Sequence, residues 1–167
     1  MTKAIRIQSV DIYTLQIPFE HPLVVPIGTM VGAENVVVKI NTDNGLVGWG
    51  EASPFAPITG DTQASNYAMA QQFAKLIMGK DPLGIEARMK EINGHTVGDP
   101  SIRSAFDMAL YDLAAKAADM LLYQLLGGEV NSEGRHREIR TGLTIGMHKT
   151  VEQSLHHDKR YLSSRID

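Results

Sequence analysis

Several features that often carry function are scarce in this sequence. The 167 residues include no cysteine and one Trp, and aromatic residues make up 6% of the chain. Without cysteine there is no disulfide framework, no thiolate metal ligand and no thiol nucleophile, which is compatible with a cytoplasmic location. Basic residues are not in excess, because 16 Lys and Arg against 19 Asp and Glu leave a formal net charge of -3. Such a chain lacks the cations that neutralise nucleic-acid phosphates, so we expect no nucleic-acid partner.

Long apolar runs are also missing. Stretches such as Val36 to Val38 fall far short of the roughly 20 residues that a membrane-spanning helix needs. The first residues lead directly into a strand pattern and contain no signal-peptide core. We therefore expect no membrane partner and a cytoplasmic protein.

The residues that are present suit a globular fold, with 43% hydrophobic and 21% charged. Residues 4–16 alternate between apolar and polar side chains, and a change of phase near Ser9 indicates a bulge. Two further alternating runs, 34–41 and 46–51, are joined by Asp43-Asn44-Gly45, and Asn-Gly strongly favours a β-hairpin. The sequence thus predicts an antiparallel meander of three strands.

Two stretches between these runs are predicted to be open loops. Residues 18–32 contain three prolines and are too long for a simple hairpin connection. Residues 50–61 contain Pro54, Pro57 and Gly60. Loops of this kind are usually functional or disordered.

Helical spacing then replaces strand alternation. Helices are predicted over 62–78, from an N-cap at Asp81-Pro82 to Gly94, from Asp99-Pro100 to about 118, and over 121–126 with Gly127-Gly128 as the C-cap. The alanines of the third helix allow close helix approach. A polar linker over 131–139, a strand over 140–146 and a helix over 150–163 follow, as in the first unit of a βα repeat.

Four segments together resemble the enolase superfamily, and within it the muconate-lactonizing subgroup. They are 34–40, Gly45 to Ala52, Ser104 to Leu113 and Leu125 to Gly128, in this order and spacing. The loop Pro54 to Gly60 is most similar to that of the dipeptide epimerases. The resemblance covers residues 1 to about 147.

This resemblance implies an α+β fold. Residues 1–130 would form an enolase-like N-terminal capping domain, with the three-stranded antiparallel meander packed on a helical bundle. Residues 131–139 would be the linker. Residues 140–167 would be the first strand and helix of an incomplete (β/α)7β barrel of the TIM type.

The resemblance also implies a Mg²⁺-dependent isomerase that abstracts the proton α to a carboxylate. A lysine moves the proton while Mg²⁺, held by three barrel carboxylates, stabilises the enediolate. The substrate would be a small carboxylate such as a dipeptide, as in L-Ala-D/L-Glu epimerases, and the enzyme a homo-oligomer. Muconate or chloromuconate cycloisomerisation and o-succinylbenzoate synthesis remain alternative reactions.

The family's first catalytic lysine would fall near position 170, beyond Asp167. We therefore expect no catalytic residue and no metal ligand in this chain, which by itself should be inactive, with Mg²⁺ bound by the full-length parent. A second hypothesis is a non-catalytic truncated module that exposes apolar surface and self-associates.

Substrate contacts are expected from both loops and from the first barrel strand. The candidates are Phe19, His21, Ile27, Thr29 and Met30 in the first loop, Phe55, Ile58 and Thr59 in the second, and Thr144 in the strand. Packing inside the cap is the competing explanation for each loop residue, and cross-strand hydroxyl bonding for Thr144.

Other polar residues are interpreted structurally. His156 and His157 point about 100° apart on a helix and do not suit one metal ion. Asp107 is expected to face a partner or a cap within the bundle. Asp112 is expected to be a surface or interdomain charge.

Overall fold

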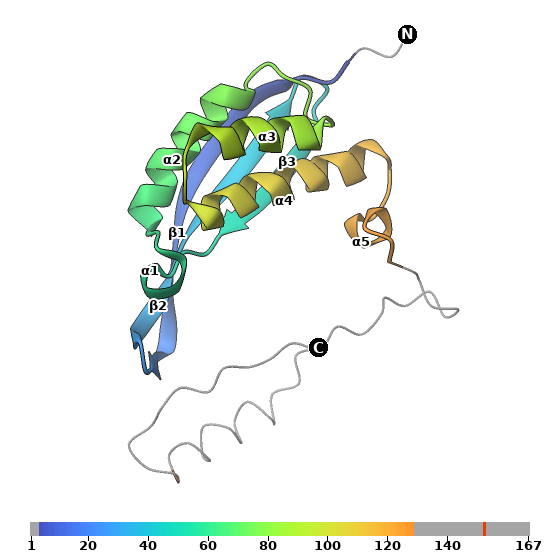
Figure 1. The fold of residues 1–167 in the computed structure, drawn as a ribbon. Helices are drawn as coiled ribbons and strands as arrows, with labels where there is room; N and C mark the ends of the chain where they lie inside the picture. Colours follow the sequence, from blue (N-terminus) through green and yellow to red (C-terminus); the bar gives the residue numbers. More distant parts are fainter. Residues whose placement is uncertain (1–3, 129–151, 153–167) are drawn as a thin grey trace, which may run out of the picture. The chain divides into compact units, whose positions relative to one another are not determined.

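The computed structural model describes residues 4–128 and residue 152 (Figure 1). Its elements are β1 (Ile7–Val25), β2 (Gly28–Thr42), β3 (Val47–Ala52), α1 (Ala56–Thr59), α2 (Gln63–Ile77), α3 (Ile85–His95), α4 (Pro100–Ala117) and α5 (Leu122–Leu125). The strands form one sheet in the order β1-β2-β3. The chain divides into two compact units, Met1–Gln16 with Glu34–Arg137 and Ile17–Ala33 with Glu138–Asp167. The described residues are therefore an α+β arrangement, as predicted.

The hairpin between β2 and β3 forms where Asn44-Gly45 predicts it. Gly45 adopts a positive φ of 89°, a conformation that favours glycine. The Thr42 amide donates to the Leu46 carbonyl oxygen at 3.0 Å, and the strands pair antiparallel from Val36↔Ala52 to Asn41↔Val47. The turn chemistry thus sets the register of the pair.

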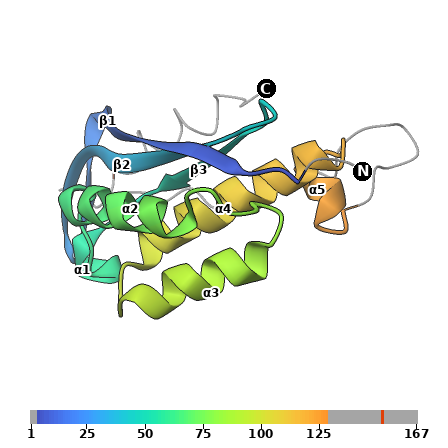
Figure 2. The same ribbon diagram turned by 90° about the horizontal axis from the view of Figure 1, so that it is seen from above.

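The core of the first unit lies between one face of the sheet and the helices. Figure 2 shows α2, α3 and α4 on the same side of the sheet. Val36, Val38 and Ile40 alternate along β2 and are completely buried toward them. The Phe73 ring of α2 meets the Phe106 ring of α4 edge to face, with centroids 5.7 Å apart. Ile7 is buried and Val10 and Ile12 pack against this core, so the phase of β1 changes near Ser9 as predicted.

Glycines let α4 approach β3 at backbone distance. A Cβ at Gly48 would collide with the carbonyl oxygen of Ala109, and one at Gly50 with that of Ala105. Neither glycine has a positive φ, so these positions require glycine because of the limited space and not because of the backbone conformation. The close approach that the alanines of α4 allow is therefore an approach to strand β3.

The prediction of an open loop over 18–32 is wrong. Strands β1 and β2 continue through this segment and are joined by a turn at Pro26 and Ile27. The prolines indicate a loop in the sequence, but Pro18 and Pro22 lie on β1, an edge strand, where proline is tolerated. We call residues 17–33 the ribbon segment.

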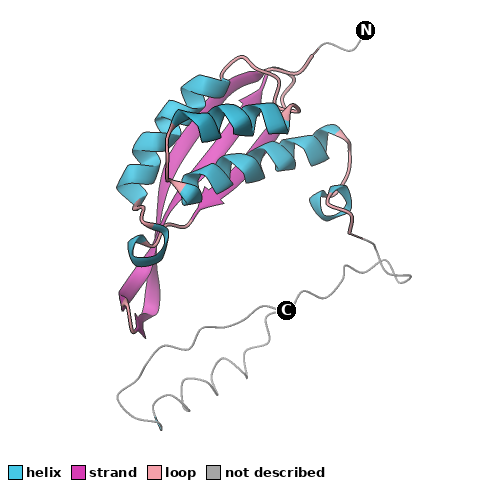
Figure 3. Cartoon of the chain, in the orientation of Figure 1, coloured by secondary structure: helices cyan, strands magenta, loops and turns pink. Residues whose placement is uncertain are grey.

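Residues 50–61 also contain more structure than predicted. Strand β3 extends to Ala52, and α1 is a short helix between β3 and α2 (Figure 3). Pro57 suits its first turn, and Gly60 ends it in the left-handed conformation at a φ of 79°. We call residues 53–61 the α1 loop.

The remaining helix predictions differ in their outcome. Helices α2 and α4 begin one residue after Thr62 and Asp99, as expected. Helix α3 begins at Ile85 and not at Pro82, because the Asp81 carboxylate accepts from the Leu83 amide at 2.9 Å and forms an Asx turn in place of an N-cap.

The C-cap of α5 is confirmed. The Gly128 amide donates to the Tyr123 carbonyl oxygen and the Gly127 amide to that of Gln124, which is a Schellman motif. The predicted linker over 131–139, strand over 140–146 and helix over 150–163 lie outside the described residues, apart from Glu152.

Candidate functional site

The α1 loop holds three of the predicted substrate contacts. Phe55 precedes the helix, Ile58 lies in it with 71% of its surface exposed, and Thr59 ends it. The Phe55 carbonyl oxygen accepts from the amides of Ile58 and Thr59, both at 2.8 Å. Since its main chain is internally bonded, the loop presents the apolar Ile58 side chain to its surroundings.

The Thr59 hydroxyl is engaged inside this loop. Its oxygen accepts from the Phe55 amide at 3.0 Å, and its hydrogen can be donated to the Phe55 carbonyl oxygen or to the Asp61 carboxylate. The Thr59 hydroxyl therefore connects the loop to Asp61.

Asp61 joins the α1 loop to α4, and the sequence reasoning did not find it. Its carboxylate is buried, with 4% of the residue exposed, and accepts from the Ser101 amide at 3.2 Å and from the Ser101 hydroxyl at 3.1 Å. Its partner lies 40 residues away in sequence, so no local spacing could reveal the contact.

The ribbon segment carries the other five described candidates. His21, Ile27 and Thr29 are exposed, and Phe19 and Met30 are half-buried. The two strands of the ribbon touch at the main chain, because a Cβ at Gly32 would lie 2.7 Å from the Ile17 carbonyl oxygen. Thr144 lies outside the described residues. The structure thus brings together Phe55, Thr59 and Asp61 in one unit and places the ribbon residues in the other.

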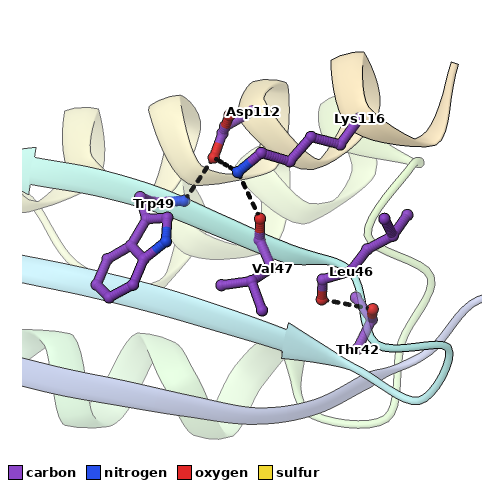
Figure 4. A network of polar contacts seen from close by, with 6 residues as sticks. All are labelled: Thr42, Leu46, Val47, Trp49, Asp112 and Lys116. Carbon is purple, nitrogen blue, oxygen red and sulfur yellow. Dashed lines mark hydrogen bonds and ion pairs between the residues drawn. The ribbon is translucent and has the colours of Figure 1, made fainter. Parts of the chain in front are cut away.

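Asp112 and Lys116 form a polar contact that the sequence analysis missed (Figure 4). The Trp49 amide donates to the Asp112 carboxylate at 2.9 Å, and the Lys116 ammonium donates to the Val47 carbonyl oxygen at 2.8 Å. The two side chains are also paired with each other at 2.6 Å. Val47 and Trp49 lie on β3, an edge strand, so these side chains occupy main-chain groups that another strand would otherwise use. In the sequence, the spacing of four residues between Asp112 and Lys116 was the available signal for a pair on one helix face.

Asp107 has an altered titration. Burial raises the pKa of its carboxyl above the usual range, and the negative charge of Glu86 raises this pKa further. Asp107 thus faces an acidic neighbour from α3.

The described residues do not fit a magnesium site. Within 4–128 and 152, no three His, Asp or Glu side chains gather so that they could hold a metal ion. No helix in this part of the chain combines the length and apolar character needed to cross a bilayer. The arrangement presents surfaces for contact and lacks, among these residues, a metal centre.

Comparison with known proteins agrees with the fold. Residues 8–127 match the family described as mandelate racemase / muconate lactonizing enzyme, N-terminal domain. The described fold is therefore that of an enolase-superfamily capping domain. The chain belongs to the mandelate racemase / muconate lactonizing enzyme family, corresponds to the N-terminal part of its members and is most like the dipeptide epimerases.

Particular relatives make this similarity concrete. The L-Ala-D/L-Glu epimerase of Bacillus subtilis is 39% identical over 127 residues, which are 75% of this chain and 34% of that protein. The structure of a dipeptide epimerase from Cytophaga hutchinsonii, complexed with Mg and D-Ala-L-Val, is similar with a TM-score of 0.83 and 31% identity, over 92% of this chain and 40% of that one.

A muconate lactonizing enzyme from Mycobacterium smegmatis, complexed with muconolactone, is similar with a TM-score of 0.82 and 27% identity, over 93% of this chain and 40% of that one. This chain therefore spans well under half the length of the relatives that it matches.

Proposed function

We propose that this chain is the N-terminal capping part of a dipeptide epimerase, an isomerase that removes and returns the proton α to a carboxylate. The observation that carries the proposal is the similarity to the Cytophaga hutchinsonii epimerase complexed with a dipeptide, which extends over 92% of this chain. The higher identity to the Bacillus subtilis enzyme supports the same reaction class.

Within such an enzyme the described residues have a defined task. Ile58 and Ile27 are exposed, by 71% and 52%, and each is an apolar side chain on a segment whose main chain is ordered by its own hydrogen bonds or strand pairing. Apolar side chains of this kind suit contact with the hydrophobic side chain of a dipeptide and the exclusion of water from the reacting carbon. We assign Phe19, Met30 and Phe55 to the same task, and His21, Thr29 and Thr59 to further contacts with the substrate.

The proposal gives no catalytic or metal-binding role to residues 4–128. The proposal includes Mg²⁺ because related structures are complexed with it. The catalytic lysines, the metal carboxylates and Thr144 would belong to the barrel. The 167-residue chain alone is expected to be inactive. The proposal further includes a cytoplasmic homo-oligomer whose partner is a small carboxylate and neither nucleic acid nor a membrane.

The experiment is to express the complete reading frame that contains this sequence and to incubate the product with Mg²⁺ and a panel of dipeptides in D₂O. Proton NMR should show loss of one Cα–H signal and growth of the epimer's signals, and chelation of the metal should stop both. The 167-residue chain is the matched control and should leave every dipeptide unchanged.

One specific observation favours a second reaction. The TM-score to the muconate lactonizing enzyme is 0.82, almost equal to that of the epimerase, so the fold of this module does not decide the chemistry. Lactone formation from cis,cis-muconate without exchange in any dipeptide would replace the epimerase proposal by cycloisomerisation. Absence of both activities in the complete product would leave a non-catalytic module.

A further inference from the structure

One buried carboxylate in the first unit has hydrogen-bond partners on two helices, α1 and α4. Asp61 ends the α1 loop and is 4% exposed, and its two oxygens accept hydrogen bonds from both sides. On one side is the Thr59 hydroxyl, and on the other are the amide and hydroxyl of Ser101. A buried carboxylate that accepts several hydrogen bonds constrains the groups that donate to it, because loss of a donor leaves a buried acceptor without its partner.

Asp61 also supplies what α4 lacks at its N-terminus. Asp99 occupies the N-cap position at a φ of 54° and makes no side-chain capping bond. The first turn of a helix has unsatisfied amides and a partial positive charge that favour a carboxylate. Asp61, which precedes α2 and α3 in the sequence, provides this carboxylate to Ser101 in the first turn of α4. The α1 loop and α4 therefore stabilise each other.

Through Thr59, Asp61 is also linked to the side chains that the proposed function places against the substrate. The Thr59 oxygen accepts from the Phe55 amide, and its hydroxyl is within reach of Asp61, which links the start of α1 to its end. Phe55 and Ile58 lie on the loop that these hydrogen bonds close. Their positions therefore depend on Asp61, although Asp61 is too buried to meet a substrate.

We propose that Asp61 is a positioning residue that sets the substrate selectivity of the parent enzyme by holding the α1 loop on the first turn of α4. This inference rests on the proposed function, because Phe55 and Ile58 are assigned there to the substrate's apolar side chain. Asp61 itself takes no part in proton transfer.

The first arm of the test measures the loop in the 167-residue chain by hydrogen exchange. Asp61→Ala should speed amide exchange of residues 53–60 by about tenfold or more, since the loop loses its anchor. Asp99→Asn is the matched control. It removes a carboxylate at the same helix end, and Asn tolerates the left-handed backbone, so exchange in the loop should not change. Unchanged exchange in Asp61→Ala would overturn the anchoring role.

Thr59 gives a milder variant in case Asp61→Ala does not fold. Thr59→Val keeps the shape and removes the hydroxyl, so it should also loosen the loop, whereas Thr59→Ser keeps the hydroxyl and should restore slow exchange. In the double variant with Asp61→Ala, the Thr59→Val change should add only the effect of losing the Phe55 amide contact, because Asp61→Ala has already removed the link between Thr59 and Asp61.

The second arm measures selectivity in the complete gene product. Asp61→Ala should lower kcat/KM for a dipeptide with a bulky apolar side chain, mainly through a higher KM, while a dipeptide with a small side chain is less affected. We expect their kcat/KM ratio to fall by about fivefold or more, within the range that one apolar contact contributes to discrimination. Asp99→Asn should leave this ratio unchanged.

The two proposals fail in different ways. A wild-type product that epimerises no dipeptide rejects the proposed function and with it the selectivity role, while the exchange data still decide whether Asp61 anchors the loop. An active wild-type enzyme whose selectivity is the same in Asp61→Ala overturns the inference alone.

Discussion

The ribbon segment and the α1 loop carry the predicted substrate contacts, yet they are held in different ways. The ribbon is an extension of paired strands, so main-chain groups fix it and most of its candidate side chains are exposed. The α1 loop is a short helical turn held by the side chains of Thr59, Asp61 and Ser101. Side chains on the ribbon can therefore change without moving its backbone, whereas the geometry of the α1 loop depends on particular residues.

The largest expected effect comes from displacing α4, which supports the α1 loop through Ser101. Gly50→Ala would place a Cβ against the carbonyl oxygen of Ala105 and push α4, which carries Ser101, away from β3. We expect a loss of about 3 kcal/mol in the free energy of unfolding, as for overpacked sites. Chemical denaturation measures this loss, and hydrogen exchange should report loosening of residues 53–60 but not of 17–33.

Gly94→Ala is its matched control. Gly94 lies within α3 and a Cβ there meets nothing within 4 Å. This change should stabilise the protein by about 0.5 kcal/mol, because alanine loses less backbone entropy in a helix. Equal stability of the two variants would contradict the close packing of α4 on β3.

A second change should disrupt the ribbon segment and leave the α1 loop intact. In Gly32→Ala the new Cβ would lie 2.7 Å from the Ile17 carbonyl oxygen, so the two strands must separate. We expect a cost of about 1 to 2 kcal/mol, confined to the ribbon. Amide exchange should rise over 17–33 and stay unchanged over 53–60. Val31→Thr, at a 70% exposed position, is the control and should change neither. Faster exchange in the α1 loop of Gly32→Ala would mean that the two regions are not independently held.

The edge of β3 is a third case, in which side chains satisfy main-chain groups. Removing Asp112 and Lys116 together, as Asp112→Ala with Lys116→Met, leaves the Trp49 amide and the Val47 carbonyl oxygen without these partners. We expect a loss of about 1 kcal/mol or less and increased self-association, because an uncovered strand edge can pair with another chain.

Sedimentation velocity over a range of concentrations tests this expectation, with Lys75→Met as a control for the lost positive charge. A monomer fraction equal to that of the unchanged chain would show that the pair does not protect the edge.

The smallest effect is expected from Asp107, which lies on α4 and belongs to neither the ribbon segment nor the α1 loop. Because its pKa is raised in the folded state, the folded protein binds more protons than the unfolded chain between the two pKa values. Asp107 therefore lowers stability as the pH rises through this interval. Asp107→Asn should be slightly more stable at pH 7, and the difference should vanish below the ordinary pKa of an Asp carboxyl, at a pH of about 4. Thermal melts of both proteins across this range measure the difference, and a variant that is less stable at pH 7 would refute the sign.

Local chemistry was enough to predict most of the elements. Asn44-Gly45 predicts the hairpin because two positions tolerate a positive φ, and the apolar spacing of α4 predicts a helix that begins after Asp99. Predictions failed where local signals compete. Asp81 can cap a helix or form an Asx turn, and the prolines of the ribbon are compatible with a loop or with an edge strand. Sequence spacing does not choose between such alternatives.

The sequence alone therefore determined the type and order of the main elements of the sheet and the helices, because turn residues, caps and apolar periodicity act within a few positions of each other. It also carried the segments that resemble the enolase superfamily. Tertiary structure decided what connects the elements: Asp61 with Ser101, Asp112 with the Trp49 amide, and Gly50 with Ala105. Each of these contacts joins residues tens of positions apart, and their distance and geometry exist only once the sheet and α4 have packed together.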